Sequence, residues 1–278
     1  MAEHTRRLST TALVASSLCA LAACGQPGHT LDPAAPSSPA VTLVDAGTLL
    51  TCTHLPYEPF QHLDDDTGDI VGFDVDLGDL VADRLGLEQR VVDVPFDSIT
   101  SGTALEDGTC DIAFAGMTIT DERAGVLDFG VPYFNANQAL LADWDSTVSG
   151  LADLHGGGRL GVQENTTGSD YAGRYATEHD DAPAIHTYPD LPALAHALRA
   201  GEIDAALADN GPLYLLARSH RDTSVKVEID TGEQYGFAVR RGNTELLTVA
   251  NEVLAEIRQD GRYEELHRKW FGVTPNQW

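Results

Sequence analysis

Short apolar runs that alternate with amphipathic segments constrain the fold of this chain more than any other feature. The runs suit strands covered on both faces and lie at residues 49–53, 91–94, 110–115, 137–142, 159–162, 203–207 and 234–240. Segments with the apolar spacing of helices lie between them, at residues 77–85, 191–200, 212–219 and 245–258. Strand–helix alternation predicts an α/β fold with a parallel, helix-covered sheet and ligands at the carboxyl ends of strands. The pattern restarts near residue 135, which predicts two lobes with a cleft between them.

The first 40 residues predict an exported, lipid-anchored protein. Two arginines precede the apolar stretch 8–22, and Leu-Ala-Ala-Cys at 21–24 resembles the lipobox of bacterial lipoproteins. We therefore expect a signal peptide at residues 1–23, a lipidated Cys24 and a Pro-, Ala- and Ser-rich tether up to residue 40. The chain would then be held on the outer face of the cytoplasmic membrane, at the cell surface or in the periplasm. The alternative is an ordinary secreted protein with a chance cysteine.

The charge of the chain excludes one large class of partners. Its 43 acidic and 17 basic residues give a formal net charge of −26 at pH 7, and such a surface repels nucleic acid. The acidic run at residues 64–69 lacks the full ligand pattern of a calcium loop and favours a polar hairpin turn. The histidines are scattered without ligand spacing, so no metal site is expected.

The cysteines predict one disulfide. Cys19 leaves with the signal peptide and Cys24 is lipidated, so Cys52 and Cys110 remain in an exported chain. An oxidising compartment and an even count favour a bond between these two residues. Two buried free thiols are the alternative.

The familiar catalytic and phosphate-binding motifs do not occur in this sequence. It has no Gly-x-Ser-x-Gly, no His-Glu-x-x-His, no Walker loop and no Gly-x-Gly-x-x-Gly. Nothing assembles a nucleophile with its base, and no cofactor is expected. A binding module is therefore favoured over an enzyme.

The stretch 111–123 places a buried strand, a glycine, two hydroxyls and an arginine in succession. Gly116 allows another group to approach the backbone closely, and Thr120 is a candidate helix N-cap. The Thr118 hydroxyl, backbone N–H groups and the Arg123 guanidinium suit one small carboxylate, because a guanidinium fork matches carboxylate geometry. The alternative is a plain strand-to-helix turn with Arg123 at the surface.

Other strand ends offer the remaining groups that a zwitterion needs. Thr166 and Thr167 are further donors at a helix start, and Asp209 is an acceptor for an ammonium group. Tyr57 and Phe96 are candidates for flat apolar walls. Each has a plainer interpretation, since the two aromatics also suit the core and Asp209 also suits the cap of the following helix.

Six motifs occur in order at residues 72–77, 115–123, 127–134, 201–209, 234–240 and 261–272. Together they resemble the polar amino-acid-binding proteins of ABC importers, bacterial solute-binding protein family 3, over residues 48–272. The resemblance implies a two-lobe, type II periplasmic-binding-protein-like fold with two hinge strands and a ligand cleft. It places lobe I at residues 41–135 plus 237–278 and lobe II at residues 138–232. The hinges would lie near residues 135–138 and 233–235.

The resemblance also assigns roles to individual residues. The family's carboxylate clamp falls on Gly116, Thr118, Arg123 and Thr167, its ammonium site on Asp209, and its stacking aromatics on Tyr57 and Phe96.

Three departures from the family lie toward the ligand side chain. Relatives such as the histidine- and glutamine-binding proteins have an Asp where this chain has His54. They often have a Gly at the position of Asn165, and the glutamine binder has a His at that of Ala208. The ligands of these relatives, glutamine or a basic amino acid, can therefore not be assigned to this chain. The change from Asp to His54 favours a polar neutral or acidic ligand.

The function implied by the resemblance is capture of a polar amino acid by lobe closure and its delivery to an ABC-type permease in the cytoplasmic membrane. We expect a monomer that the lipid anchor holds at this membrane. The alternatives are a periplasmic enzyme on the same fold, similar to cyclohexadienyl dehydratases, and a ligand-sensing module.

Overall fold

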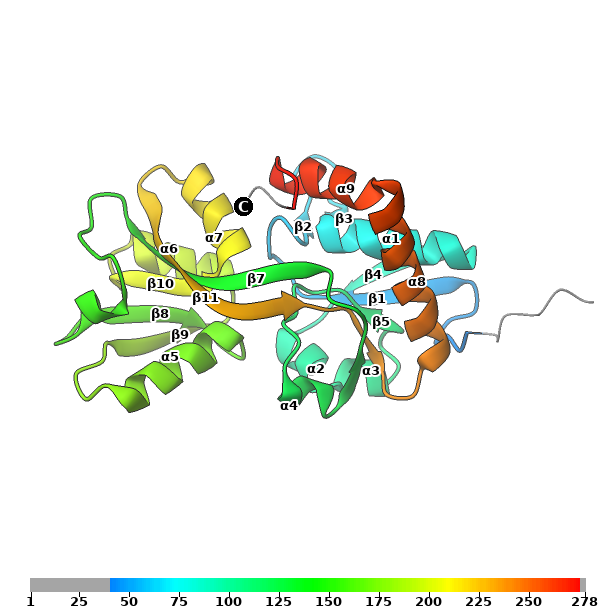
Figure 1. Cartoon of the computed structure of the whole chain (residues 1–278), viewed down its shortest axis with the longest axis horizontal. Helices are drawn as coiled ribbons and strands as arrows, with labels where there is room; N and C mark the ends of the chain where they lie inside the picture. The colour runs from blue at the N-terminus through cyan, green and yellow to red at the C-terminus, as the bar shows by residue number, and fades with distance from the viewer. Residues whose placement is uncertain (1–40, 276–278) are drawn as a thin grey trace, which may run out of the picture. The chain divides into compact units, whose positions relative to one another are not determined.

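The computed structural model describes residues 41–275, so the expected signal peptide, Cys24 and the tether lie outside the described part of the chain. The chain forms two five-stranded sheets (Figure 1). The first sheet has the order β4-β1-β5-β12-β6, formed by Glu88–Asp93, Thr48–Thr53, Ile112–Ala113, Ala238–Arg240 and Leu127–Phe129. The second has the order β11-β7-β10-β8-β9, formed by Thr223–Tyr235, Phe134–Asp143, Ala205–Asp209, Arg159–Gln163 and Ala184–Tyr188.

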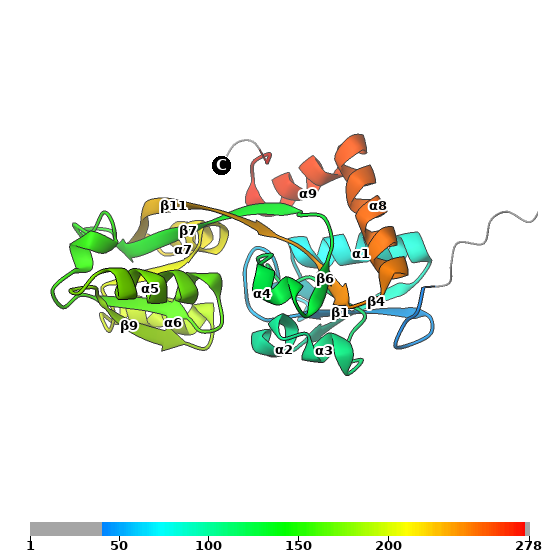
Figure 2. The same cartoon turned by 60° about the horizontal axis from the view of Figure 1, so that its bottom comes forward.

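Helices cover both faces of the first sheet (Figure 2). One face carries α1 (Phe73–Leu85), α8 (Thr244–Asp260) and α9 (Arg262–Phe271), and the other carries α2 (Phe96–Thr100) and α3 (Thr103–Glu106). Successive residues of β1 point to opposite faces: Leu49 packs with the first group and Leu50 and Cys52 with the second. A strand buried on both faces reads as a continuous apolar run, which explains the runs in the sequence.

The second sheet is covered in the same way. The helices α6 (Leu191–Arg199) and α7 (Asn210–Ser219) pack on one face. On the other lie α5 (Thr167–Glu178) and the 3₁₀ helix η1 (Leu151–Leu154). The short helix α4 (Asp121–Ala124) follows β5, and Thr120 caps it by accepting a hydrogen bond from the Arg123 N–H, as the sequence predicted. The predicted polar hairpin is the turn between β2 (His62–Leu63) and β3 (Ile70–Val71).

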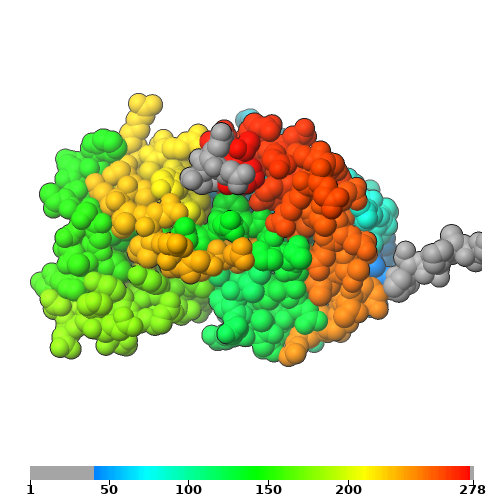
Figure 3. All heavy atoms as spheres, viewed as in Figure 1, coloured from blue at the N-terminus to red at the C-terminus, as the bar shows by residue number. Residues whose placement is uncertain are grey.

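Two long antiparallel strands, β7 and β11, carry the chain between the sheets. They pair from Phe134 opposite Tyr235 to Asp143 opposite Thr223, with register shifts between Val225 and Val227 and between Ile229 and Glu233. The space-filling view shows residues of β11, in orange, crossing this face of the molecule (Figure 3). The hinges expected near residues 135–138 and 233–235 fall within this pair. The lobe boundaries themselves stay a prediction.

Two sequence expectations about strands are wrong. The sheets are mixed rather than parallel, because β12 runs antiparallel to β5 and β6, and β7 runs antiparallel to β10. Residues 234–240 are also not one strand: β11 ends at Tyr235 and β12 begins at Ala238. Between them, a Cβ on Gly236 would lie 2.7 Å from side-chain atoms of Ile119, so the chain needs glycine where it passes from one sheet to the other.

The predicted disulfide between Cys52 and Cys110 is confirmed. The two Cα atoms are 5.6 Å apart, and both residues are buried, Cys52 in β1 and Cys110 just before β5. The bond ties neighbouring strands of the first sheet across a sequence separation of 58 residues. Within residues 41–275, no helix combines the length and apolar character needed to cross a bilayer.

Loss of this disulfide should destabilise the protein. Closing a loop of this length restricts the unfolded chain and contributes roughly 4 kcal/mol in the chain-entropy model. We expect the Cys52→Ala/Cys110→Ala variant to unfold at a lower urea concentration than the oxidised wild type. Its unfolding midpoint should lie close to that of the reduced wild type. Peptide mapping that finds both wild-type cysteines open to alkylation without reductant would contradict the bond.

Candidate functional site

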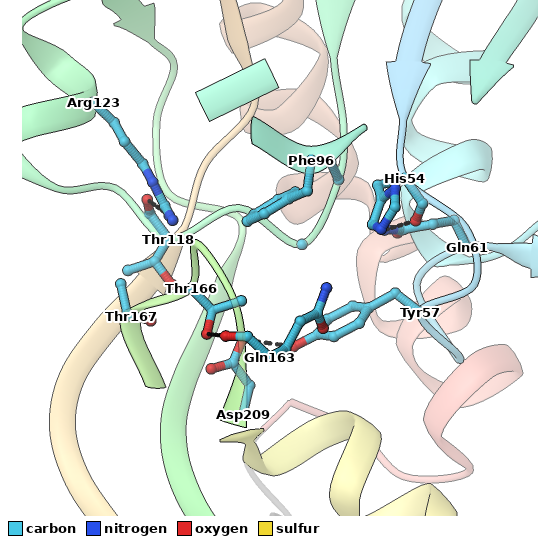
Figure 4. A pocket seen from close by; sticks show the side chains of 12 residues that line it. His54, Tyr57, Gln61, Phe96, Thr118, Arg123, Gln163, Thr166, Thr167 and Asp209 are labelled. Carbon is cyan, nitrogen blue, oxygen red and sulfur yellow. Dashed lines mark hydrogen bonds between the residues drawn. The ribbon is translucent and has the colours of Figure 1, made fainter. Parts of the chain in front are cut away.

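A pocket lies where loops at the strand ends of both sheets meet (Figure 4). It contains about 350 Å³ of space not filled by protein atoms, part of it open to solvent. Its walls are His54, Tyr57, Gln61, Phe96, Ala115, Gly116, Thr118, Arg123, Gln163, Thr166, Thr167 and Asp209. The seven residues proposed from the sequence for the carboxylate clamp, the ammonium site and the aromatic walls therefore all line this one pocket.

Arg123 reaches this pocket from α4 and is buried rather than on the surface. Its Nη1 donates to the Thr118 carbonyl at 2.8 Å and its Nη2 to the Asn165 carbonyl at 3.2 Å. The guanidinium also lies 5.5 Å from the centre of the Phe96 ring. Burial lowers the pKa of Arg123, and the charge of Asp209 acts in the opposite direction. A guanidinium has five N–H donors, so donors remain for a ligand.

Asp209 lies at the end of β10, where α7 begins. It occupies the N-cap position of α7, but its side chain makes no capping hydrogen bond. Its carboxylate instead accepts from the hydroxyl of Tyr57 at 2.7 Å, from the Tyr235 hydroxyl, and from Gln138 Nε2 at 2.5 Å. Burial is the main cause of its raised pKa, which these hydrogen bonds oppose.

Neither Arg123 nor Asp209 takes part in any of the ion pairs between residues 41 and 275. Burying a charge without a counter-ion is unfavourable unless hydrogen bonds or a bound group compensate. The pocket therefore presents one buried cation and one buried anion, an arrangement that suits a small zwitterion.

The family of this chain follows from a match over most of its length. The model of the bacterial extracellular solute-binding proteins, family 3, matches residues 49–273. The chain belongs to this family.

Two named relatives support the family assignment. A probable histidine-binding protein of Neisseria gonorrhoeae is 30% identical over 270 residues, 96% of each chain. A glutamine-binding protein of an ABC transporter from Bacillus subtilis is 32% identical over 213 residues, 75% of this chain and 76% of the relative.

Solved structures are similar as well. An ancestral arginine-binding protein bound to arginine is 34% identical with a TM-score of 0.75, covering 81% of this chain and 99% of its own. An ancestral amino-acid-binding protein, a precursor of cyclohexadienyl dehydratase, is 32% identical with a TM-score of 0.73. The match covers 81% of this chain and 95% of the ancestral protein. The expected two-lobe α/β fold of this family is thus confirmed.

The hydroxyls of Thr118 and Thr167 already have an acceptor in this structure. Thr118 Oγ1 donates to Glu233 Oε2 at 3.1 Å and Thr167 Oγ1 donates to the same oxygen at 2.6 Å. Gln138 Nε2 lies 3.3 Å from that oxygen and 3.3 Å from Thr167 Oγ1. Thr166 caps α5 by accepting from the Ser169 N–H. Neither Gln138 nor Glu233 was expected here.

Gly116 lies against Tyr57 in the pocket, with a backbone φ of 54°. A Cβ at this position would be 3.0 Å from the Tyr57 ring, so glycine allows this close approach. The Gly116 N–H, however, donates to Asp74 Oδ2 at 2.6 Å. The N–H of this expected clamp residue is therefore already engaged inside the protein.

Asp74 is not the N-cap of α1, although Asp is a residue type that often caps helices. Gly72 holds the N-cap position of α1, and Asp74 lies buried in the first turn. Its Oδ2 also accepts from the Tyr133 hydroxyl at 2.9 Å, while its buried Oδ1 has no partner among the described residues. Burial raises its pKa to about 7. Asp74 thus holds the Gly116 backbone from behind the pocket wall.

His54 and Gln61 form another end of the pocket and offer two acceptor atoms. His54 Nδ1 lies 3.0 Å from the Val94 carbonyl, which can only accept, so this nitrogen carries the hydrogen and Nε2 is the acceptor of the neutral ring. Gln61 Nε2 donates to the His54 carbonyl at 3.2 Å. The remaining polar atoms, His54 Nε2 and Gln61 Oε1, are buried and have no partner within residues 41–275.

Asn165 and Ala208, the other two residues expected to contact a ligand side chain, are not in the pocket wall. Asn165 has a left-handed φ of 60°, a conformation that Gly and Asn adopt readily, and its carbonyl accepts from Arg123. Ala208 packs in the apolar layer beneath α6 and α7. In this structure, backbone conformation is the notable feature of Asn165, and apolar packing is that of Ala208. Within the described residues, no group of three or more His, Cys, Asp or Glu side chains is placed to hold a metal ion.

The raised pKa of Asp74 predicts a pH-dependent stability. Since its folded pKa of about 7 exceeds the ordinary 3.8, the folded chain keeps a proton that the unfolded chain releases above about pH 4. This group should therefore lower the free energy of unfolding by roughly 4 kcal/mol as pH rises from about 4 to about 7.

The measurement is urea unfolding across that pH range. We expect Asp74→Asn to lose this part of the pH dependence, while Asp83→Asn, an exposed carboxyl on the same helix, keeps it. Parallel pH profiles for the wild type and Asp74→Asn would show that Asp74 is ionised in the folded protein.

Proposed function

We propose that this chain binds a polar amino acid outside the cytoplasm and delivers it to an ABC-type importer. The observation that carries the proposal is the pair of buried, unpaired opposite charges, Arg123 and Asp209, in one pocket. The ligand's carboxylate would pair with the guanidinium and its ammonium group with Asp209. Family membership and the names of the relatives point to the same class of ligand.

Lobe closure follows from where the binding groups come from. Arg123, in α4, and Tyr57, in the loop after β1, lie on the side of the first sheet. Asp209, at the end of β10, and Thr167, at the start of α5, lie on the side of the second. A ligand that contacts both sets stabilises the closed arrangement only through contacts that the open one lacks. The β7–β11 pair is the candidate hinge, with lobe I at residues 41–135 plus 237–278 and lobe II at 138–232.

The ligand's side chain would lie against His54, Gln61 and Phe96. The two unpartnered acceptors, His54 Nε2 and Gln61 Oε1, favour a side chain that ends in N–H groups, such as an amide. An acidic side chain would place a carboxylate against these acceptors, so of the two ligand classes expected from the sequence the neutral one is preferred.

The lipid anchor, the monomeric state and the lack of enzymatic activity are also proposals. Cys24 would carry the lipid that holds a monomer at the outer face of the cytoplasmic membrane, beside its permease. We propose no enzymatic activity, because the pocket's one buried carboxylate, Asp209, is already held by two tyrosines and Gln138. The similar precursor of cyclohexadienyl dehydratase makes incubation with prephenate or arogenate the direct test, and turnover of either would overturn this assignment.

A thermal-shift screen of the twenty amino acids tests the proposed function. A ligand at one hundred times its dissociation constant stabilises the folded state by about 2.7 kcal/mol. We expect the largest shift with a polar amino acid that has a side-chain N–H donor and a smaller one with aspartate or glutamate. A screen without any shift, repeated by calorimetry, would reject amino-acid binding.

Removing either charge should weaken binding of the amino acid found in that screen. We expect Arg123→Ala and Asp209→Asn each to cost at least about 2 kcal/mol, roughly thirtyfold in Kd, because each leaves one charge of the ligand without its partner. Arg174→Ala is the matched control, since this exposed arginine lies on α5 outside the pocket wall. Undiminished affinity of both variants, measured by calorimetry, would mean that the ligand binds elsewhere.

A further inference from the structure

Glu233 places a carboxylate against two residues of the pocket wall, Thr118 and Thr167, and neither the charge pair nor the expected clamp accounts for it. It lies on β11, near the end of the strand that enters the first sheet, and is half-buried. Its Oε2 is the common acceptor of Thr118 Oγ1 at 3.1 Å, Thr167 Oγ1 at 2.6 Å and Gln138 Nε2 at 3.3 Å. Three donors converging on one oxygen is the arrangement expected around a bound carboxylate.

Two of these donors are residues of the proposed carboxylate clamp. A hydroxyl has only one hydrogen, so Thr118 and Thr167 cannot donate to Glu233 and to a ligand at the same time. Two carboxylates sharing one set of donors would also repel each other in a partly buried site. Binding of a ligand's carboxylate to these hydroxyls therefore requires Glu233 to leave them.

The Glu233 contacts also join residues of the two sheets directly. Thr118 precedes α4 on the side of the first sheet, Thr167 begins α5 on the second, and Glu233 touches both. The β7–β11 register shifts between Ile229 and Glu233, with Gly232 at a φ of 65°. An interruption of this kind bends the strand locally, just before Glu233.

We propose that Glu233 stands in for the ligand's α-carboxylate in the ligand-free protein, so that an amino acid must displace it in order to bind. This inference rests on the proposed function and identifies the residue that opposes it. Glu233 thereby lowers the affinity for ligands that have an α-carboxylate and leaves the affinity for ligands without one unchanged.

The test compares amino acids with their decarboxylated amines on the full-length protein. Calorimetry is run with L-glutamine and 4-aminobutanamide, L-histidine and histamine, and L-arginine and agmatine. We expect Glu233→Ala to lower the Kd of the amino acid that binds at least fivefold and to leave that of its amine unchanged. Glu233→Gln, which keeps the shape but not the charge, should lie between. Weaker binding of the amino acid to Glu233→Ala would overturn the proposal, because Glu233 would then assist the ligand.

A second measurement needs no ligand. Hydrogen exchange of the ligand-free protein should speed up severalfold at residues 116–123 and 163–169 in Glu233→Ala, since the contact joining them is lost. Asp230→Asn is the control, because Asp230 is an exposed acid on the same strand whose side chain accepts from the nearby Gly232 N–H. Unchanged exchange in Glu233→Ala would also overturn the proposal. If the wild type binds no amino acid, the proposed function is wrong. The hydrogen-exchange comparison then still tests whether Glu233 holds Thr118 and Thr167 together.

Discussion

The antiparallel pairing of β7 with β11 is the interaction on which the rest of this structure depends. It is the only long ladder in the described chain that runs from one sheet to the other. It brings Gln138, Glu233 and Tyr235, which are far apart in sequence, into contact with the pocket residues Asp209 and Thr167. Without this ladder, the loops of the two sheets would be joined mainly by single side-chain hydrogen bonds, such as those from Tyr57 to Asp209 and from Arg123 to the Asn165 carbonyl. A binding site assembled from both sheets is therefore only as well defined as the pair of strands that joins them.

The pocket itself is organised by buried charges that the protein leaves incompletely compensated. Asp209 is surrounded by two tyrosine hydroxyls and an amide, and Arg123 by two carbonyls and an aromatic ring. Neutral partners fix the geometry of a charged group and lower the cost of burying it, but they do not neutralise it. In the proposed function, this residual charge would favour a zwitterionic ligand over water, and the carboxylate of Glu233 would make that advantage smaller.

Several features could be predicted from the sequence because they depend on local patterns. The helices α1, α6 and α7 follow from apolar spacing, and the cap at Thr120 from a hydroxyl before a short polar helix. Other features lacked such a signal. The chain's mixed sheets and the break at Gly236 depend on which strands become neighbours, and Asp74 has the residue type of a helix cap although burial behind Gly116 gives it another role. Asn165 and Ala208 differ from relatives in sequence, but only the fold shows that they lie outside the pocket wall.

The sequence by itself determined most of the helices and strands, the disulfide pair and which chemical groups stand at strand ends, because periodicity, cysteine count and residue type are local properties of the sequence. It also pointed to Arg123 and Asp209 as partners for one ligand. Only the tertiary structure decided which atoms of those residues remain available. The Gly116 N–H is held by Asp74, the Thr118 and Thr167 hydroxyls by Glu233, and the free acceptors lie on His54 and Gln61. The physical reason is that each donor hydrogen serves one acceptor, and the acceptors come from distant segments that only folding brings together.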